Sequence, residues 1–252
     1  NIVLKKEKTL GVNGSINTTI GIPFNARATT NFNIRTEKFN IFNTLGYFHR
    51  ESPGSGLFDN RYLTDASDYD RILEDREITR NDDGISVNIG MEYFLTDKSS
   101  VTGSFFYRWS DENDLTENDN LRYIEEELDS RTYRSEDQQE NDNSYQFSLN
   151  YINKFNDDGH QLTADFQYSY DDEDILTEIQ ENNTVPDTEL LARENIYEIE
   201  TQDDILAQID YVLPMGEAQF EAGYRGSFEK SVSDYQLDTL NQGTGQFETN
   251  AD

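Results

Sequence analysis

Apolar and polar residues alternate one by one on both sides of a short connection at residues 213–217, which contains a proline and a glycine. Alternation with a period of two places one face of a strand in an apolar medium and the other in a polar one. Two such runs joined by a tight connection predict a β-hairpin. The apolar positions are Ile205, Ala207, Ile209, Tyr211 and Leu213 in the first run, and Ala218, Phe220, Ala222, Tyr224 and Phe228 in the second.

This unit recurs along the chain and predicts about nine strands. The alternation is sharpest after Ile85 and again after Tyr145, whereas the two faces are less distinct between Phe39 and Arg50. We expect strands at residues 11–22, 26–36, 39–50, 85–93, 101–109, 145–151, 162–170, 205–213 and 218–228.

Short and long connections alternate between these strands. The short turns lie near Glu37, Asp97, Asp158 and Met215, and the long, polar and mostly acidic connections span residues 51–81, 111–143 and 171–201. We interpret the long connections as loops. Hairpins with short turns on one side and long loops on the other are typical of a transmembrane antiparallel up-and-down β-barrel, with short periplasmic turns and long extracellular loops. The strands also approach the roughly 9–11 residues that cross a bilayer at the tilt of a barrel.

Composition restricts the function further. The 252 residues include 51 acidic and 20 basic side chains, for a net charge of −31, which argues against a nucleic-acid partner because phosphate contacts need clustered Lys and Arg. Only 34% of the residues are hydrophobic, yet a barrel needs only one apolar face. There is no cysteine and therefore no disulfide framework. The sequence contains no run of about 18 apolar residues, so it does not predict a membrane-spanning helix.

Several segments resemble a known family. Residues 1–15, NIVLKKEKTLGVNGS, resemble the junction between plug and barrel in TonB-dependent receptors of the Bacteroidetes type, where an INIVLKK strand closes the plug and GxxGS begins the first barrel strand. Residues 35–42, RTEKFNIF, are similar to the turn between that family's second and third strands. Residues 159–170 and 216–227 are similar to its later hairpins. The resemblance covers essentially the whole chain.

The resemblance implies an all-β protein of the outer membrane. Residues 1–9 would end the plug, and residues 10–252 would form the N-terminal part of a barrel of about 22 strands, so that the sequence is a piece of a longer protein. The implied function is uptake of a bulky solute (a glycan, a peptide or a metal chelate) energised by TonB. Outer-membrane lipid and TonB are the implied partners, together with a surface lipoprotein or a larger outer-membrane complex. An enzymatic activity is not expected.

The two faces of the strands carry the candidate functional residues. We expect the polar face to point into the lumen, where it hydrates the interior, contacts the plug or contacts solute. The expected lumen-facing residues are Asn88, Glu92, Arg108, Asp165, Gln167, Asp210, Glu221 and Arg225. Aromatic side chains near the ends of the apolar stripes predict an interfacial girdle rather than a platform for stacking sugars. The expected girdle residues are Tyr107, Trp109, Tyr168, Tyr170, Tyr211 and Tyr224.

Acidic segments and histidines are the remaining candidates. The segments 111–120, DENDLTENDN, and 171–174, DDED, offer oxygen ligands that suit Ca²⁺, but neither matches an EF-hand loop. We interpret them as solvated loops, with Ca²⁺ binding as the alternative, and expect no other metal or cofactor. His49 and His160 are expected at opposite rims of the barrel, which argues against a catalytic or metal-binding pair.

Two other classes of protein remain open at this point. One is a non-transporting barrel that serves a surface assembly or a secretion complex. The other is a soluble, secreted, acidic β-repeat adhesin that folds on Ca²⁺, whose apolar stripes would be buried against another sheet.

Overall fold

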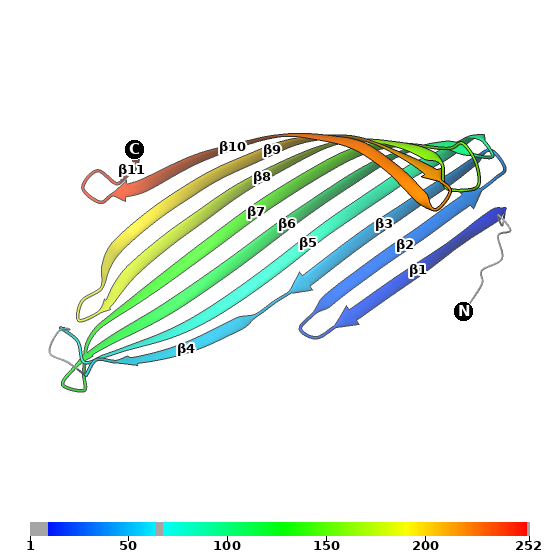
Figure 1. Ribbon diagram of the computed structural model, residues 1–252. Coiled ribbons are helices and arrows are strands. Elements are labelled where there is room, and N and C mark those ends of the chain that lie inside the picture. The colour runs from blue at the N-terminus through cyan, green and yellow to red at the C-terminus, as the bar shows by residue number, and fades with distance from the viewer. Residues whose placement is uncertain (1–9, 64–67, 251–252) are drawn as a thin grey trace.

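The computed structural model describes residues 10–63 and 68–250, which form one antiparallel sheet of eleven strands (Figure 1). No helix long and apolar enough to cross a membrane occurs in these residues. The plug junction expected at residues 1–9 lies outside them. The strands are β1 (Gly11–Gly21), β2 (Asn25–Arg35), β3 (Phe39–Glu51), β4 (Gly54–Arg61), β5 (Arg71–Thr96), β6 (Ser99–Ile124), β7 (Glu127–Lys154), β8 (Gln161–Val185), β9 (Glu189–Met215), β10 (Ala218–Asn241) and β11 (Gln246–Thr249).

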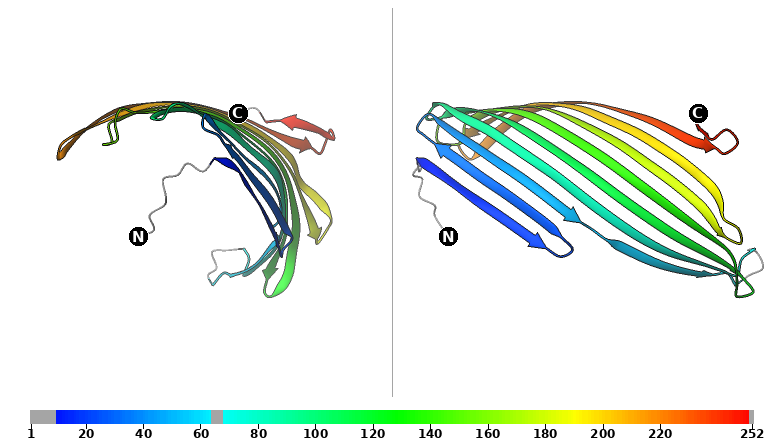
Figure 2. Two further views of the ribbon diagram at one scale, coloured as in Figure 1. Left: turned by 90° about the vertical axis from the view of Figure 1, so that its right-hand side faces the viewer. Right: turned by 180° about the vertical axis from the view of Figure 1, so that it is seen from behind.

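The strands follow one another across the sheet in the order of the sequence. Each pairs with the next, except that β4 continues the line of β3 and pairs with β5. The sheet is a single curved layer (Figure 2, left), and no pairing among the described residues joins its first and last strands. The prediction of an up-and-down antiparallel sheet is therefore confirmed. The estimate of nine strands was too low because it omitted β4 and β11.

The predicted short turns all lie at one end of the sheet (Figure 1). They join β2 to β3, β5 to β6, β7 to β8 and β9 to β10, and the last of these is a two-residue turn with Gly216 at a φ of 65°. The opposite end holds the connections between β6 and β7 and between β8 and β9. Hairpins of this kind place these four turns on the same side of a membrane.

The long acidic loops predicted at residues 111–143 and 171–201 are wrong, and the one at 51–81 is wrong for residues 54–61 and 71–81, which belong to β4 and β5. The acidic segments continue the strands there, so that β5 to β9 reach 25 to 28 residues each. The connection between β6 and β7 is only the pair Glu125 and Glu126, with φ values of 51° and 66°. Positive φ at both central residues is the signature of a type I′ hairpin turn. The acidic residues are held in strands by the backbone ladder and by cross-strand ion pairs such as Arg131–Asp119, at 2.5 Å.

The sheet has one layer and no conventional core. Ile179 is the one buried hydrophobic residue among those described, at 5% exposure, and large apolar side chains remain exposed along one face. No second sheet covers the stripes in the described part of the chain, whereas the soluble adhesin alternative expects one there. Exposed apolar stripes on a single sheet are expected when lipid covers them.

We call the residues of this stripe the apolar band, namely residues 85–95 of β5, 101–109 of β6, 145–151 of β7, 162–170 of β8 and 205–213 of β9. The parts of these strands beyond the band, away from the short turns, form the extension: residues 71–83, 111–124, 127–143, 171–185 and 189–204.

Candidate functional site

Cross-strand register places all eight residues expected in the lumen on the same face of the sheet. Arg108 pairs with Ser86, two residues from Asn88, and Asp165 pairs with Gln208, which pairs with Arg225. Since the side-chain period is two, this register carries Glu92, Gln167, Asp210 and Glu221 onto the same side. We call it the polar face. A side-chain hydrogen bond from Asn150 to Asp165, at 2.6 Å, also lies on it.

An aromatic row crosses the other face where the apolar band meets the extension. Tyr107 pairs with Tyr145, which pairs with Tyr170, and the ring centroids are 5.0 Å and 6.4 Å apart. Tyr145 was not among the expected girdle residues, although it lies in register with two that were.

Hydroxyl groups mark the same boundary. Tyr47 donates to Asp83 at 3.1 Å, Tyr107 to Asn143 at 3.1 Å, and Tyr168 to Asp203 at 2.8 Å. Each ring therefore lies against the apolar band while its hydroxyl reaches a polar residue of the extension, which is the arrangement expected at a membrane interface.

The remaining expected girdle residues divide between the two ends and the middle of the band. Trp109 lies beside the aromatic row, and Tyr211 lies near the short turns, where its hydroxyl is 2.8 Å from Nε2 of His160. Tyr224 instead lies in the middle of the apolar run of β10, between Phe220 and Phe228, at 73% exposure. A girdle position at a strand end is therefore wrong for Tyr224, because the apolar run continues past it.

A cavity of about 950 Å³ opens on the polar face, across the sheet from the aromatic row, and is lined by Arg27, Phe48, Arg50, Asp82 and Arg108, among others. The register brings these residues together from four strands, since Arg27 pairs with Phe48 and Arg50 pairs with Asp82. The Arg27 and Arg108 guanidinium carbons lie 5.9 Å and 6.0 Å from the centre of the Phe48 ring. Arg50 forms an ion pair with Asp82 at 2.8 Å.

Glycine makes this arrangement of the Phe48 ring feasible. Gly84 is the cross-strand partner of Phe48, and a Cβ atom on Gly84 would lie 2.5 Å from that ring. The ring therefore covers the backbone of β5 at a position with no side chain. Such glycines in strands mark a close approach of neighbouring groups.

Comparison with known families agrees with this geometry. Residues 153–252 match the model of the outer membrane protein beta-barrel family. The chain folds as a β-barrel of the outer membrane. No curated protein matches the sequence. The matched region begins in β7 and includes all of β8 to β11. In an outer-membrane barrel the exposed apolar band faces lipid. The extension then projects from the membrane on the side away from the short turns.

The extension of the barrel gathers carboxylates on the polar face. One carboxylate oxygen each from Glu140, Asp142 and Glu173 lie within 4.8 Å of one another. Burial, followed by the charges of Asp142 and Glu173, raises the pKa of Glu140. Burial, followed by neighbouring carboxylates, also raises the pKa of Glu112 and of Glu173. Each of these side chains therefore holds a proton more readily than a free glutamate does.

Only one of the two acidic segments considered as Ca²⁺ sites contributes to a group of neighbouring carboxylates in the barrel. Glu173 of residues 171–174 belongs to the carboxylate group described above. Residues 111–120 lie within β6, where alternation sends neighbouring side chains to opposite faces. A strand cannot wrap around one ion, so this segment does not form a calcium loop of its own.

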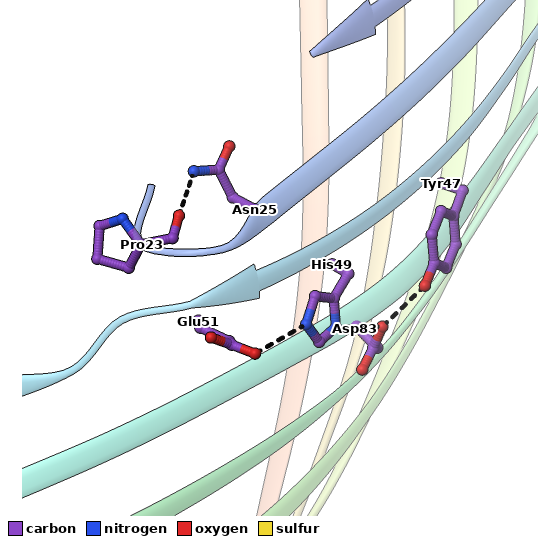
Figure 3. A network of polar contacts seen from close by, with 6 residues as sticks. All are labelled: Pro23, Asn25, Tyr47, His49, Glu51 and Asp83. Carbon is purple, nitrogen blue, oxygen red and sulfur yellow. Dashed lines mark hydrogen bonds and ion pairs between the residues drawn. The ribbon is translucent and has the colours of Figure 1, made fainter. Parts of the chain in front are cut away.

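The two histidines lie at opposite ends of the barrel strands. His49 lies near the end of β3, where its Nδ1 is 2.9 Å from Asp83 and its Nε2 is 3.8 Å from Glu51 (Figure 3). Asp83 also accepts the hydroxyl of Tyr47, and nearby Asn25 donates to the carbonyl of Pro23 at 2.9 Å (Figure 3). The contacts of Tyr47 and His49 with Asp83 tie β3 to β5 at the boundary between band and extension. His160 lies beside the turn between β7 and β8.

Proposed function

We propose that this outer-membrane barrel imports a bulky solute, a glycan, a peptide or a metal chelate, by a TonB-dependent and non-enzymatic mechanism. The observation that carries the proposal is the continuous polar face opposite the apolar band. From Asn88 on β5 to Arg225 on β10 it presents charged and amide side chains along the whole membrane-spanning depth. A barrel that enclosed only a packed core would not need them.

The width of the sheet supports a large lumen. Ten strands lie side by side before any closure. The backbone groups at the open edges must be paired in lipid, so the complete barrel has at least this many strands around its lumen. Barrels of roughly 16–18 strands leave an aqueous channel, and those with 22 strands enclose a plugged lumen. A solute larger than a few atoms therefore fits this architecture.

The mechanism that follows is the one implied by the family resemblance of the N-terminal residues. Solute binds from the extracellular side, and TonB, driven by the proton-motive force, remodels a plug to open a path. Outer-membrane lipid surrounds the apolar band. A surface lipoprotein or a larger complex would contact the extension.

Growth experiments test this proposal. Strains that lack the complete gene, or that lack TonB, are grown on single glycans, on peptides and on chelated iron as limiting nutrients. Both strains are expected to lose growth on the same nutrient, and a plasmid copy of the complete gene restores it only in the first strain. Unimpaired growth on every nutrient in the gene deletion would contradict solute uptake. A loss that occurs only in the gene deletion would contradict the dependence on TonB.

A second candidate function is a non-transporting role in a surface assembly or secretion complex. One observation favours it: in the extension, on the same side as the apolar band, Leu176 pairs with Tyr197 beside Ile199. Tyr197 and Ile199 are 39% and 48% exposed. Native gel electrophoresis of detergent extracts tests this role, because an assembly component migrates with partners that the purified barrel lacks.

A further inference from the structure

Arg27, Phe48 and Arg108 form a cluster on the polar face, in which both guanidinium groups lie near the aromatic ring. We infer that this cluster binds an anionic group, a carboxylate or a phosphate, carried by the solute. The inference rests on the proposed uptake function, because it assigns a chemical class to the cargo. It concerns the cavity of about 950 Å³ described above.

The first step is the charge state of the two arginines. Neither Arg27 nor Arg108 has an ion pair or a hydrogen bond to a carboxylate among the residues that the structure describes, and both guanidinium groups lie near the Phe48 ring. This is unusual in a chain with 51 acidic and 20 basic residues. Arg50 in the same cavity is neutralised by Asp82 at 2.8 Å. Glu51, the other carboxylate that lines the cavity, lies 3.8 Å from His49. The cavity therefore keeps two guanidinium groups that have no carboxylate within 4.0 Å among the described residues.

The second step concerns the carboxylates of an adjoining cavity that Arg108 also lines. Asp142, Asp171, Asp172 and Glu173 line it, but none of them forms an ion pair with Arg108 within 4.0 Å. Asp142 accepts a hydrogen bond from Ser110 at 3.1 Å, and Asp171 accepts one from Ser144 at 2.5 Å. Both carboxylates are thus held by serine hydroxyls of the neighbouring strands.

The third step is the chemistry of the pair. A guanidinium is always charged and offers five N–H donors in a planar fork that matches carboxylate and phosphate oxygens. Stacking on an aromatic ring restrains that plane without using its N–H groups. Phe48, held over Gly84, thus orients both guanidiniums beside one cavity before any ligand arrives. Charge-assisted, bidentate contacts of this kind are the strong ones.

The position of the cluster suits a first contact with solute. Arg108 is adjacent to Trp109 and Tyr107 of the interfacial aromatic row, so the cluster lies at the extracellular boundary of the apolar band. A solute that enters along the polar face of the extension meets this cavity before it reaches the membrane-spanning depth. The acidic extension disfavours anions in general, so the two arginines select solutes that carry an anionic group beside other polar groups.

Binding to the complete, detergent-solubilised protein tests the inference without a transport assay. Phosphorus NMR line broadening is measured with inorganic phosphate and with glucose 6-phosphate, and equilibrium dialysis with labelled citrate; glucose is the neutral control. We expect the three anions to bind in competition with one another. The double variant Arg27→Gln/Arg108→Gln is expected to weaken binding roughly tenfold or more. Binding by the unchanged protein should weaken with added salt.

Arg35→Gln is the matched control, because it removes the same charge from the same strand and face as Arg27, beside the Phe94 ring and away from the cavity. It should leave anion binding unchanged. No anion binding by the unchanged protein, or equal losses in the control and the double variant, would overturn the inference. Anion binding that depends on Arg27 and Arg108 in a protein whose deletion leaves all uptake intact would instead refute the proposed function and keep the site.

Discussion

Gly84→Ala is the substitution that most directly tests how the polar face is packed. The added Cβ would lie 2.5 Å and 2.7 Å from two Phe48 ring carbons and 2.8 Å from the carbonyl oxygen of Trp109. Ordinary contact between carbon atoms begins at roughly 3.5 Å, so the ring must retreat by about 1 Å. The Trp109 carbonyl belongs to the backbone ladder between β5 and β6, so it moves less easily than the ring.

Overpacking of this kind costs about 1–3 kcal/mol, and we expect Gly84→Ala to lower the free energy of unfolding by about 2 kcal/mol. Gly103→Ala is the matched control, because no atom lies within 4 Å of its added Cβ. A strand glycine is about 0.5–1 kcal/mol less favourable than alanine, so Gly103→Ala should be neutral or stabilising. The smaller side chain in the double variant Gly84→Ala/Phe48→Leu should restore part of the stability lost in Gly84→Ala.

Urea unfolding in lipid vesicles, followed by the fluorescence of Trp109, measures these differences. Trp109 is the only tryptophan of the sequence and pairs with Ile85, next to the altered position. Equal stability of Gly84→Ala and the unchanged protein would refute the close approach of Phe48. Equal destabilisation by Gly103→Ala would show that any strand side chain here is unfavourable, and would refute the reasoning in another way.

Three further predictions concern the extension and its border with the apolar band. Arg50→Gln leaves Asp82, which is 7% exposed, without its cation. Because the Arg50 side chain itself is 58% exposed, we expect urea unfolding to show a loss of only about 1–2 kcal/mol in the free energy of unfolding. Adding Asp82→Asn should restore part of that loss. The pKa of Glu140 is raised, so its contribution to stability is complete below the pKa of an unfolded glutamate and is lost as pH rises through the folded value. Glu140→Gln should therefore stabilise the sheet by about 0.5 kcal/mol at pH 7.5 and by nothing at pH 4, and a gain that persists at pH 4 would contradict a charge effect. Replacing Glu125 by Asn and Glu126 by Gly fits the positive φ values of both positions. The free energy of opening the β6–β7 turn should rise by about 1 kcal/mol, which slows amide hydrogen exchange there. Unchanged exchange would argue against a type I′ turn.

The sequence predicts the strands well only where lipid covers one face. Phe147 and Leu149 alternate with polar residues because the bilayer requires it, and β7 was placed correctly there. Between Asp137 and Asn143 both faces of the same strand meet water, so polar residues follow one another without a period. Backbone pairing with β6 and β8 keeps this part extended, and such pairing leaves no mark in the composition.

The candidate site shows the same limit. Alternation alone assigned Arg108 to the polar face. Its neighbours Arg27 and Phe48 come from β2 and β3, and only the register across β5 brings them beside it. Gly84, a glycine inside an otherwise regular strand, was the one local signal of a close approach.

The length of the extension has a consequence for how this protein reaches its final place. About 15 residues of β6 lie beyond the apolar band, or roughly 50 Å of strand. Between Asp111 and Asp142 the β6–β7 hairpin carries thirteen acidic and three basic residues, all of which must pass through the hydrocarbon layer from the periplasm. Each charge costs about 2.5–3.5 kcal/mol at the centre of a bilayer. We therefore expect spontaneous insertion to be prohibitively slow, and biogenesis of this barrel to need a catalyst that opens a polar route for its hairpins.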